Sequence, residues 1–427
     1  MKSRRAALKV LAQVREGRPF EAALDGAVKG LQENDRRLAH EMAAGVLRRQ
    51  NALDARLRPL VPRGLDAVAP ILRDVLRLGA FQLSALDRVP AHAAVDTSVM
   101  LAKESGGARA GGFVNAVLRR LGDAPPAPQP AGSAAERLAA IHSHPLWLTE
   151  RWLEWYGEED AERLLRWNDS RPRLVLQPAR ASLEALERRW KDAGIAVERA
   201  PHDAGLITDR RRPQDLPGYD EGAFIVQDPA QALLARYADL SPGATVYDAS
   251  AAPGGKTIAL GRSVKRVIAG DVNRSRVRRL AQNLARAGSG REFPVVADAR
   301  RPPLRQVDAV LVDAPCLGTG TFARHPDARG RVTMQGLEAL VQRQQELLDQ
   351  AATAVAPGGL LVYATCSLEP EENGEQIARF LARHPEFRRE PSATVPAALL
   401  SPEGDLMVLP HRDQMDGAYG ARLRRAV

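Results

Sequence analysis

The sequence predicts a multidomain protein with an all-α bundle, a small α+β connecting unit and a doubly wound α/β domain. The chain has 427 residues, which is more than one compact core usually holds. In the N-terminal part, apolar residues recur at helical spacing, as Leu38, Met42 and Val46 do. From residue 225 onward, short apolar strands alternate with helices, a pattern typical of a parallel sheet covered on both faces.

The N-terminal segment 1–123 is expected to contain only helices. One helix spans "DRRLAHEMAAGVLRRQ", and a second, "AAVDTSVMLAKESGG", is expected to stop at Gly106 and Gly107 before a third begins. The following segment, 124–134, contains four prolines and is predicted to be a linker.

Segment 135–224 is predicted to hold a helical connector followed by a small α+β subdomain of the RRM-like kind. In that subdomain "RLVLQPA" and "IAVERA" have the pattern of strands, and "SLEALERRWKDAG" has the pattern of a helix.

The remaining segment, 225–427, is predicted to be the catalytic α/β domain. Its expected strands end at or near Asp271, Asp298 and Asp313, and a helix over 337–355 is expected to stop at Pro357-Gly358-Gly359 before the strand "LLVYAT". Ligands of doubly wound sheets bind outside the carboxyl ends of the strands. The three aspartates and both cysteines of this domain's candidate set fall at or just after these ends, so we expect a ligand-binding site there.

A glycine-rich turn, "SAAPGGKT", follows the first strand of this domain. It is not a P-loop, since Ser250 stands where that motif has glycine, and no G-x-G-x-x-G follows the strand. A tight turn plus Asp271 at the end of the second strand, where an acid can bind ribose hydroxyls, favours a nucleoside cofactor such as S-adenosylmethionine. The alternative is that the glycines only turn the chain and Asp271 only caps a helix.

Cys316 and Cys366 are the only cysteines, and both follow predicted strands. A thiolate that adds to carbon 6 of cytosine makes carbon 5 nucleophilic enough to accept a methyl group, which is covalent catalysis. Asp313, three residues before Cys316, could protonate or hydrogen-bond the ring. The residues alone do not order the roles of the two thiols, and the alternative for each is a small buried apolar side chain.

The segments "DASAAPGGKT", "DAPCLGTG" and "YATCSLEPEEN", preceded by "QDPAQALLA", resemble the RNA 5-methylcytosine methyltransferases. The resemblance implies that Cys366 is the nucleophile, that Cys316 assists product release, and that Asp313 and Lys256 act near the target base. It also implies a set of residues that bind S-adenosylmethionine. These are Ser250, Ala251, Ala252, Pro253, Gly254, Gly255, Lys256, Asp271, Asp298 and Asp313.

The N-terminal segments "DRRLAHEMAAGVLRRQ", "LDRVPAHAAVDTSVMLAK" and "GGFVNAVLRR" resemble the RNA-binding domain of the NusB family. Together, the two resemblances indicate a bacterial 16S ribosomal RNA cytosine-5 methyltransferase. They imply cytosine 967 as the target and 16S RNA or a small-subunit precursor as the partner. Ser250 and Leu317 depart from the usual family pattern, and the C-terminal "DGAYGARL" has fewer aromatic residues than expected.

The bulk properties fit this expectation. A net charge of +9 favours a polyanionic partner, and arginines such as Arg210–Arg212 and Arg274–Arg279 could contact phosphates. With two cysteines, no metal-ligand spacing, no signal peptide and no membrane span, the sequence predicts a cytoplasmic protein without metal. Together with the resemblance, this leads us to expect an enzyme that acts as a monomer. The alternatives are a DNA cytosine-5 methyltransferase, in which Cys316 would attack, an enzyme for another RNA, and a non-catalytic RNA-binding or antitermination factor.

Overall fold

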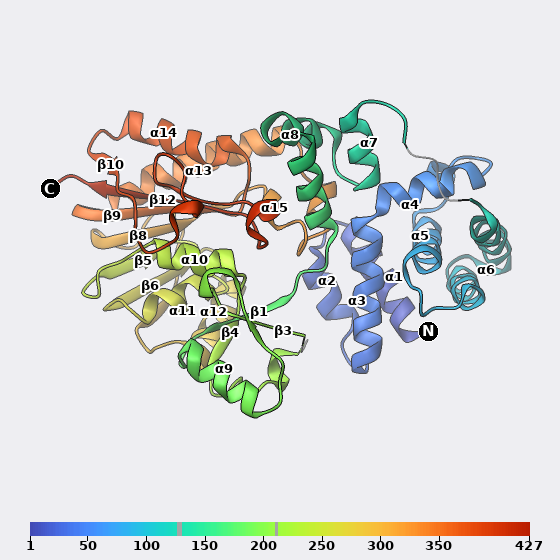
Figure 1. Ribbon diagram of the computed structural model, residues 1–427, viewed down its shortest axis with the longest axis horizontal. Helices are drawn as coiled ribbons and strands as arrows, with labels where there is room; N and C mark the ends of the chain where they lie inside the picture. Colours follow the sequence, from blue (N-terminus) through green and yellow to red (C-terminus); the bar gives the residue numbers. More distant parts are fainter. Residues whose placement is uncertain (126–129, 210–211) are drawn as a thin grey trace. The chain divides into compact units, whose positions relative to one another are not determined.

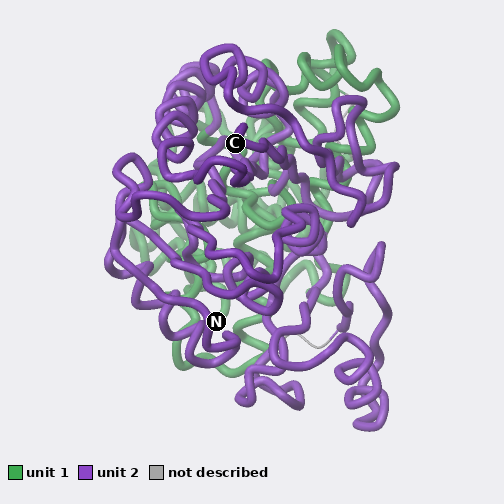
Figure 2. The backbone as a smooth tube through the Cα atoms, turned by 90° about the vertical axis from the view of Figure 1, so that its left-hand side faces the viewer, with its two compact units in different colours: residues 1–170, 322–331 green, residues 171–321, 332–427 purple. Residues whose placement is uncertain are grey.

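The computed structural model describes residues 1–125, 130–209 and 212–427. Part of the predicted linker and two of the arginines named above, Arg210 and Arg211, therefore lie outside the described residues. The chain forms two compact units, coloured separately in Figure 2. The first unit contains residues 1–170 and 322–331, and the second contains 171–321 and 332–427.

The described residues of the first unit form helices joined by loops and contain no β-strand. Acidic residues near helix starts and basic residues near helix ends, such as Glu33 and Arg48 in the third helix, complement the helix dipole. Ser133 and Glu136 form a capping box at the seventh helix. The helices are α1 (Lys2–Arg15), α2 (Phe20–Ala27), α3 (Glu33–Arg48), α4 (Gln50–Leu57), α5 (Pro70–Ala85), α6 (Ala91–Asp123), α7 (Ala134–Ile141) and α8 (Leu146–Asp169).

The predicted helix stop at Gly106 and Gly107 appears as a kink inside α6. Gly107 has φ +76°, which is the left-handed region that glycine tolerates best, so the two halves of α6 differ in direction. The core of this unit is continuous from α1 to α6 and includes Phe20, Met42 and Leu57, each almost fully buried. The helices α7 and α8, which make up the predicted helical connector, belong to the first unit, where α7 contacts α4.

Residues 322–331 belong to the first unit although they lie far along the chain. Phe322 packs its ring near Trp152, with centroids 6.3 Å apart. The buried guanidinium of Arg329 donates to Asp169 Oδ1 at 2.8 Å and to the carbonyl oxygens of Arg48 and His142 at 3.2 Å each. This short segment thus completes the polar contacts of the helical unit.

The second unit begins with a four-stranded antiparallel sheet in the order β2-β3-β1-β4. Its strands are β1 (Leu174–Pro178), β2 (Glu198–Arg199), β3 (Leu206–Thr208) and β4 (Phe224–Val226), and its helix is α9 (Leu183–Asp192). Trp190 of α9 packs against Phe224 with ring centroids 5.1 Å apart, which anchors the helix on the sheet.

The larger sheet has eight strands, seven of them in the order β10-β12-β9-β8-β5-β6-β7, while β11 pairs with β12 (Figure 1). Counted from β5, the five parallel strands run 3-2-1-4-5, the order of doubly wound nucleotide-binding sheets. The strands are β5 (Thr245–Asp248), β6 (Arg266–Asp271), β7 (Glu292–Val296), β8 (Val307–Asp313), β9 (Val355–Thr365), β10 (Phe387–Arg389), β11 (Leu406–Val408) and β12 (Ala418–Arg425).

Helices cover both faces of this sheet. In Figure 1, α13 and α14 lie on one face and α10, α11 and α12 on the other. Their bounds are α10 (Pro229–Tyr237), α11 (Gly255–Gly261), α12 (Arg274–Ala287), α13 (Met334–Thr353), α14 (Gly374–Arg383) and the short α15 (Pro410–Asp413). None of the described helices is long and apolar enough to cross a membrane.

Two details differ from the sequence prediction. The sheet is mixed rather than wholly parallel, because β12 runs antiparallel to β9, β10 and β11. The helix expected over 337–355 ends at Thr353, and Pro357-Gly358-Gly359 lies inside β9. The pairing register of β8 with β9 shifts there, and Gly358 has φ +71°, so these residues form an irregularity in a strand instead of a helix stop.

Candidate functional site

The sequence-predicted residues gather at the carboxyl ends of the parallel strands. Asp271 ends β6 and Asp313 ends β8, while Cys366 directly follows β9. Asp248, which was not among the predicted residues, ends β5. The strand order reverses between β5 and β8, and crevices at such a switch point are where doubly wound sheets bind ligands. Asp313 pairs in register with Ala364, which brings the Cys316 and Cys366 loops to adjacent positions.

The turn after β5 is held tightly by backbone contacts. Ala251 N–H donates to the Gly270 carbonyl at 2.8 Å, and Asn283 Nδ2 donates to the Pro253 carbonyl at 2.7 Å. Gly254 has φ +111°, and a Cβ atom there would meet Leu280 at 2.9 Å. Glycine is therefore required, and α11 begins directly after this turn.

The two predicted cofactor acids have different surroundings. Asp271 is buried, accepts from Asn273 N–H at 2.8 Å and pairs with the exposed Arg276 at 3.1 Å. Asp298 lies two residues beyond β7, where the side chain and backbone N–H of Arg300 lower the pKa of its carboxyl to about 2. Asp298 is therefore ionised at neutral pH, and Asp271 accepts a backbone hydrogen bond beside an arginine.

Lys256 and Asp313 form an ion pair. Lys256 Nζ donates to Asp313 Oδ2 at 2.6 Å, and the Lys256 side chain is only 12% exposed. Burial lowers the pKa of Lys256, but the charge and hydrogen bond of Asp313, helped by the charge of Asp248, outweigh it and raise the pKa overall. The ammonium group is therefore a fixed positive charge between the β5 turn and the two thiol loops.

The two thiols are in contact. Cys316 Sγ lies 3.4 Å from Cys366 Sγ, and Cys366 N–H donates to Cys316 Sγ at 3.3 Å. Both side chains are half-buried. The hydrogen bond with Cys366, burial, and the nearby Glu372 carboxylate raise the pKa of the Cys316 thiol well above its usual value, so it stays protonated at neutral pH.

Glycines let the two thiol loops approach backbone to backbone. Gly320 N–H donates to the Cys366 carbonyl at 3.0 Å, and a Cβ atom on Gly320 would meet that oxygen at 2.9 Å and the Gly417 Cα at 2.6 Å. Gly318 has φ +70° and faces Cys366 Sγ. The two glycines of "PCLGTG" therefore have two roles: Gly318 allows the turn, and Gly320 allows the backbones of the two thiol loops to pack closely.

Two buried residues that sequence reasoning missed hold the Cys316 loop. Gln344 Nε2, on α13, donates to the Pro315 carbonyl at 2.9 Å and to Glu372 Oε1 at 2.8 Å. Glu372 in turn accepts from Leu317 N–H at 3.1 Å. A signal for Gln344 was present, since this glutamine occupies a position of the apolar stripe on its helix.

Asp248 is a further buried acid beside the site. Its Oδ2 accepts from Thr257 Oγ1 at 2.7 Å, while its Oδ1 has no hydrogen-bond partner among the described residues. Burial and the nearby Asp313 raise its pKa to about 6, against the opposing effects of Thr257 and Lys256. The motif "YDAS" gave no hint that this carboxyl would be buried.

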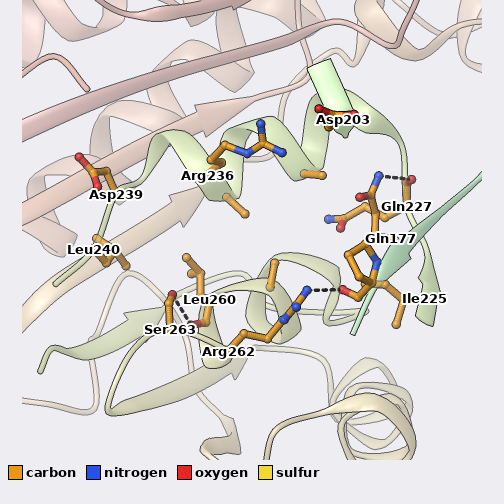
Figure 3. A pocket seen from close by; sticks show the side chains of 14 residues that line it. Gln177, Asp203, Ile225, Gln227, Arg236, Asp239, Leu240, Leu260, Arg262 and Ser263 are labelled. Carbon is orange, nitrogen blue, oxygen red and sulfur yellow. Dashed lines mark hydrogen bonds between the residues drawn. The ribbon is translucent and has the colours of Figure 1, made fainter. Parts of the chain in front are cut away.

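A cavity of about 370 Å³ lies elsewhere in the second unit, and none of the predicted site residues lines it (Figure 3). Gln177 and Gln227 lie at one end, where Gln177 Nε2 reaches the Gln227 carbonyl at 3.4 Å, and Arg262 donates to the Pro178 carbonyl at 2.9 Å. In the described ranges, no group of three or more His, Cys, Asp or Glu residues could hold a metal ion.

The strand order, the turn after β5 and the acids at the strand ends define a Rossmann-like methyltransferase, joined to a helical NusB-like region. The chain belongs to the RsmB/F family of 16S rRNA methyltransferases, whose model matches residues 235–424, and the NusB family model matches residues 1–123. The predicted fold class and the family resemblance are confirmed by these matches.

Relatives are similar along nearly the whole chain. A probable ribosomal RNA small subunit methyltransferase B from Synechocystis is 34% identical over 424 residues, covering 95% of each chain. The ribosomal RNA small subunit methyltransferase B of Vibrio cholerae is 34% identical over 447 residues, covering 100% of this chain and 98% of the relative. The crystal structure of PH0851 has a TM-score of 0.84 and 27% identity, covering 99% of this chain and 98% of that one.

Proposed function

We propose that the protein transfers a methyl group from S-adenosylmethionine to carbon 5 of a cytosine in 16S ribosomal RNA, namely cytosine 967. Segment 225–427 would carry the chemistry and segment 1–123 would bind RNA, with the protein acting as a cytoplasmic monomer. The observation that carries the proposal is the 3.4 Å contact between Cys316 and Cys366, in the loops that follow the adjacent strands β8 and β9 of a methyltransferase sheet. Names of the full-length relatives support the small-subunit RNA as substrate.

The residues at the strand ends fit S-adenosylmethionine. The segment from Ser250 to Lys256 would take the cofactor against its backbone, because Gly254 leaves no Cβ in the way. The Asp271 and Asp298 carboxylates are acceptors for hydroxyl and amino groups of a nucleoside. When bound, S-adenosylmethionine supplies an electrophilic methyl group.

The chain's own residues would prepare the base. The Cys366 thiolate would add to carbon 6, forming a carbon–sulfur bond and moving the ring electrons toward carbon 5. Asp313, held by Lys256 at 2.6 Å, would hydrogen-bond or protonate the ring nitrogen where negative charge develops. To reach these groups the cytosine must leave its stack and enter the site.

Cys316 would act in the release step. A base, such as a water molecule, would take the proton from carbon 5, and the electrons of that carbon–hydrogen bond would form the carbon 5–carbon 6 double bond. The carbon–sulfur bond would break at the same time, and Cys366 would leave as a thiolate with the electron pair of that bond. Because the Cys316 thiol is protonated and already in contact with Cys366 Sγ, it can donate a hydrogen bond to the departing sulfur. Cys316 therefore assists elimination, whereas Cys366 performs the attack.

Phosphate contacts would come from exposed arginines. Arg274, Arg278 and Arg279 are exposed on α12, which starts three residues after Asp271. Contacts of this kind make RNA affinity fall as salt concentration rises.

The test is a denaturing gel of wild type, Cys316→Ala and Cys366→Ala after incubation with unmodified 16S RNA and S-adenosylmethionine. We expect a slow-migrating protein–RNA band for Cys316→Ala and neither band nor methyl transfer for Cys366→Ala. A band for Cys366→Ala alone would reverse the roles toward the DNA-enzyme arrangement. Absence of methyl transfer by wild type on both naked RNA and small-subunit precursor would favour a non-catalytic RNA-binding factor.

A further inference from the structure

We propose that Gln344 and Glu372 are positioning residues for the release step, because they fix the backbone on both sides of Cys316 and thereby hold its thiol against Cys366. Given the proposed function, these two residues would set the lifetime of the covalent RNA adduct. Neither residue would touch the RNA or the cofactor.

The Gln344 amide fixes the backbone before Cys316. Both of its N–H groups are used, one by the Pro315 carbonyl at 2.9 Å and the other by Glu372 Oε1 at 2.8 Å. Gln344 is fully buried on α13, so water cannot replace these bonds. The helix therefore supplies a rigid support for the Cys316 loop.

The Glu372 carboxylate fixes the backbone after Cys316. It accepts from Leu317 N–H with both oxygens, at 3.1 and 3.3 Å. Its own carbonyl accepts from Tyr363 Oη at 2.8 Å. Glu372 thus joins the loop of Cys316 to the loop of Cys366.

The hydrogen bonds of Gln344 and Glu372 hold the Cys316 loop so that its thiol stays in contact with the Cys366 sulfur, as elimination requires. Sulfur atoms 3.4 Å apart are in contact, and a small loop displacement would break that contact. Misplacement of a reacting group by about 1 Å can slow a step by about 10²-fold. The negative Glu372 also contributes to the raised pKa of Cys316, which keeps that thiol protonated while Cys366 attacks.

The experiment measures adduct formation and adduct release separately for the full-length protein. RNA and S-adenosylmethionine are mixed with enzyme in excess, and the covalent band is followed over time on denaturing gels together with methyl transfer. Gln344→Met keeps the side-chain length but removes both donors. Glu372→Ala removes the acceptor, and Glu372→Gln keeps an oxygen for Leu317 N–H.

We expect Gln344→Met and Glu372→Ala to form the adduct at nearly the wild-type rate but to release it about 10- to 100-fold more slowly. Glu372→Gln is expected to release the adduct faster than Glu372→Ala. The matched control is Gln376→Met on α14. Gln376 is also fully buried and donates to a backbone carbonyl, that of Val341 at 2.8 Å, but it does not contact the Cys316 loop.

Selective slowing of release in Gln344→Met, with Gln376→Met like wild type, supports the positioning role. Release at the wild-type rate in both Gln344→Met and Glu372→Ala overturns it. Equal losses of formation and release in Gln344→Met and Gln376→Met, with matching drops in melting temperature, also overturn it, since general destabilisation then explains the data. Failure of the proposed function would show separately, as no adduct trapping by Cys316→Ala and no methyl transfer by wild type.

Discussion

Lys256 and Asp313 join the turn after β5 to the end of β8 through a hydrogen bond of 2.6 Å. The pair spans the switch point of the sheet, so it lies between the proposed cofactor segment and the thiol loops. Because Asp313 balances the charge of a lysine that is only 12% exposed, neither member can be removed without changing the other.

Asp313→Asn is expected to lower methyl transfer and adduct formation by about 10²- to 10⁴-fold, the usual contribution of a positioned acid or base. The substitution also leaves Lys256 buried beside a neutral amide. Single-turnover methyl transfer from labelled S-adenosylmethionine measures the effect. Asp308→Asn, at the opposite end of the same strand, is the control, and equal activities of the two variants would contradict a role for Asp313 in the chemistry.

Hydrogen peroxide is expected to inactivate the enzyme by joining Cys316 to Cys366. One thiolate attacks the peroxide, giving a sulfenic acid and releasing hydroxide, and the second thiol displaces water from that sulfur to form the disulfide. The 3.4 Å contact favours the second step over further oxidation. Intact mass should show the loss of two hydrogens, and dithiothreitol should restore activity. Peroxide-treated Cys316→Ala should show no such loss, and intermolecular dimers as the only wild-type product would contradict the prediction.

Asp248 is expected to make stability depend on pH between about 4 and 6. Its folded-state pKa of about 6 lies above the ordinary 3.8, so the folded protein holds this proton more tightly than the unfolded chain does. At low pH this carboxyl adds up to about 3 kcal/mol to the free energy of unfolding. That contribution is lost as pH rises from about 4 to about 6. Urea unfolding at pH 4 to 8 measures it.

Asp248→Asn should remove this dependence while keeping an acceptor for Thr257. The variant should therefore gain stability relative to wild type as pH rises from about 4 to about 6, and the difference should then stay constant. A difference that does not change with pH would show that Asp248 titrates normally.

Arg329→Leu is expected to destabilise the first unit by about 3 to 5 kcal/mol, as removal of one partner from a buried ion pair does. The change removes the guanidinium donor from Asp169, which keeps its contact with His142, and from the carbonyl oxygens of Arg48, His142 and Asn168. Urea unfolding gives the loss. Arg166→Leu, which breaks an exposed pair with Glu162, should cost about 1 kcal/mol or less, and similar losses in both variants would contradict the buried role of Arg329.

The alternation of strands and helices was enough to place the thiols, Asp313 and Lys256 at one edge of the sheet, because parallel strands all end on the same side. It could not reveal Gln344 and Glu372, which are 28 residues apart and whose contacts are tertiary. Gln344 interrupts the stripe formed by Leu337, Val341 and Leu348, and a polar residue at a core position of a helix is a signal worth following.

The antiparallel direction of β12 could not be predicted from the pattern either, since the direction of a strand added beside the parallel strands depends on the path of the loop before it. The position of Pro357-Gly358-Gly359 was misread for a related reason. Proline and glycine indicate an irregular backbone, but the sequence alone does not distinguish the end of a helix from an irregularity within a strand.

The membership of residues 322–331 in the first unit has a consequence for biosynthesis. The ribosome makes residues 1–170 first, yet the segment carrying Phe322 and Arg329 emerges only after β8 and the Cys316 loop have been made. Until then Asp169 and the carbonyl oxygens of Arg48 and Asn168 lack the Arg329 guanidinium, so the nascent helical unit is incomplete while more than a hundred residues are added. A fragment that ends at residue 170 would lack residues 322–331 permanently, so its helical unit would stay incomplete. The two units are therefore interlaced along the chain, and neither can be cut out as a simple continuous piece.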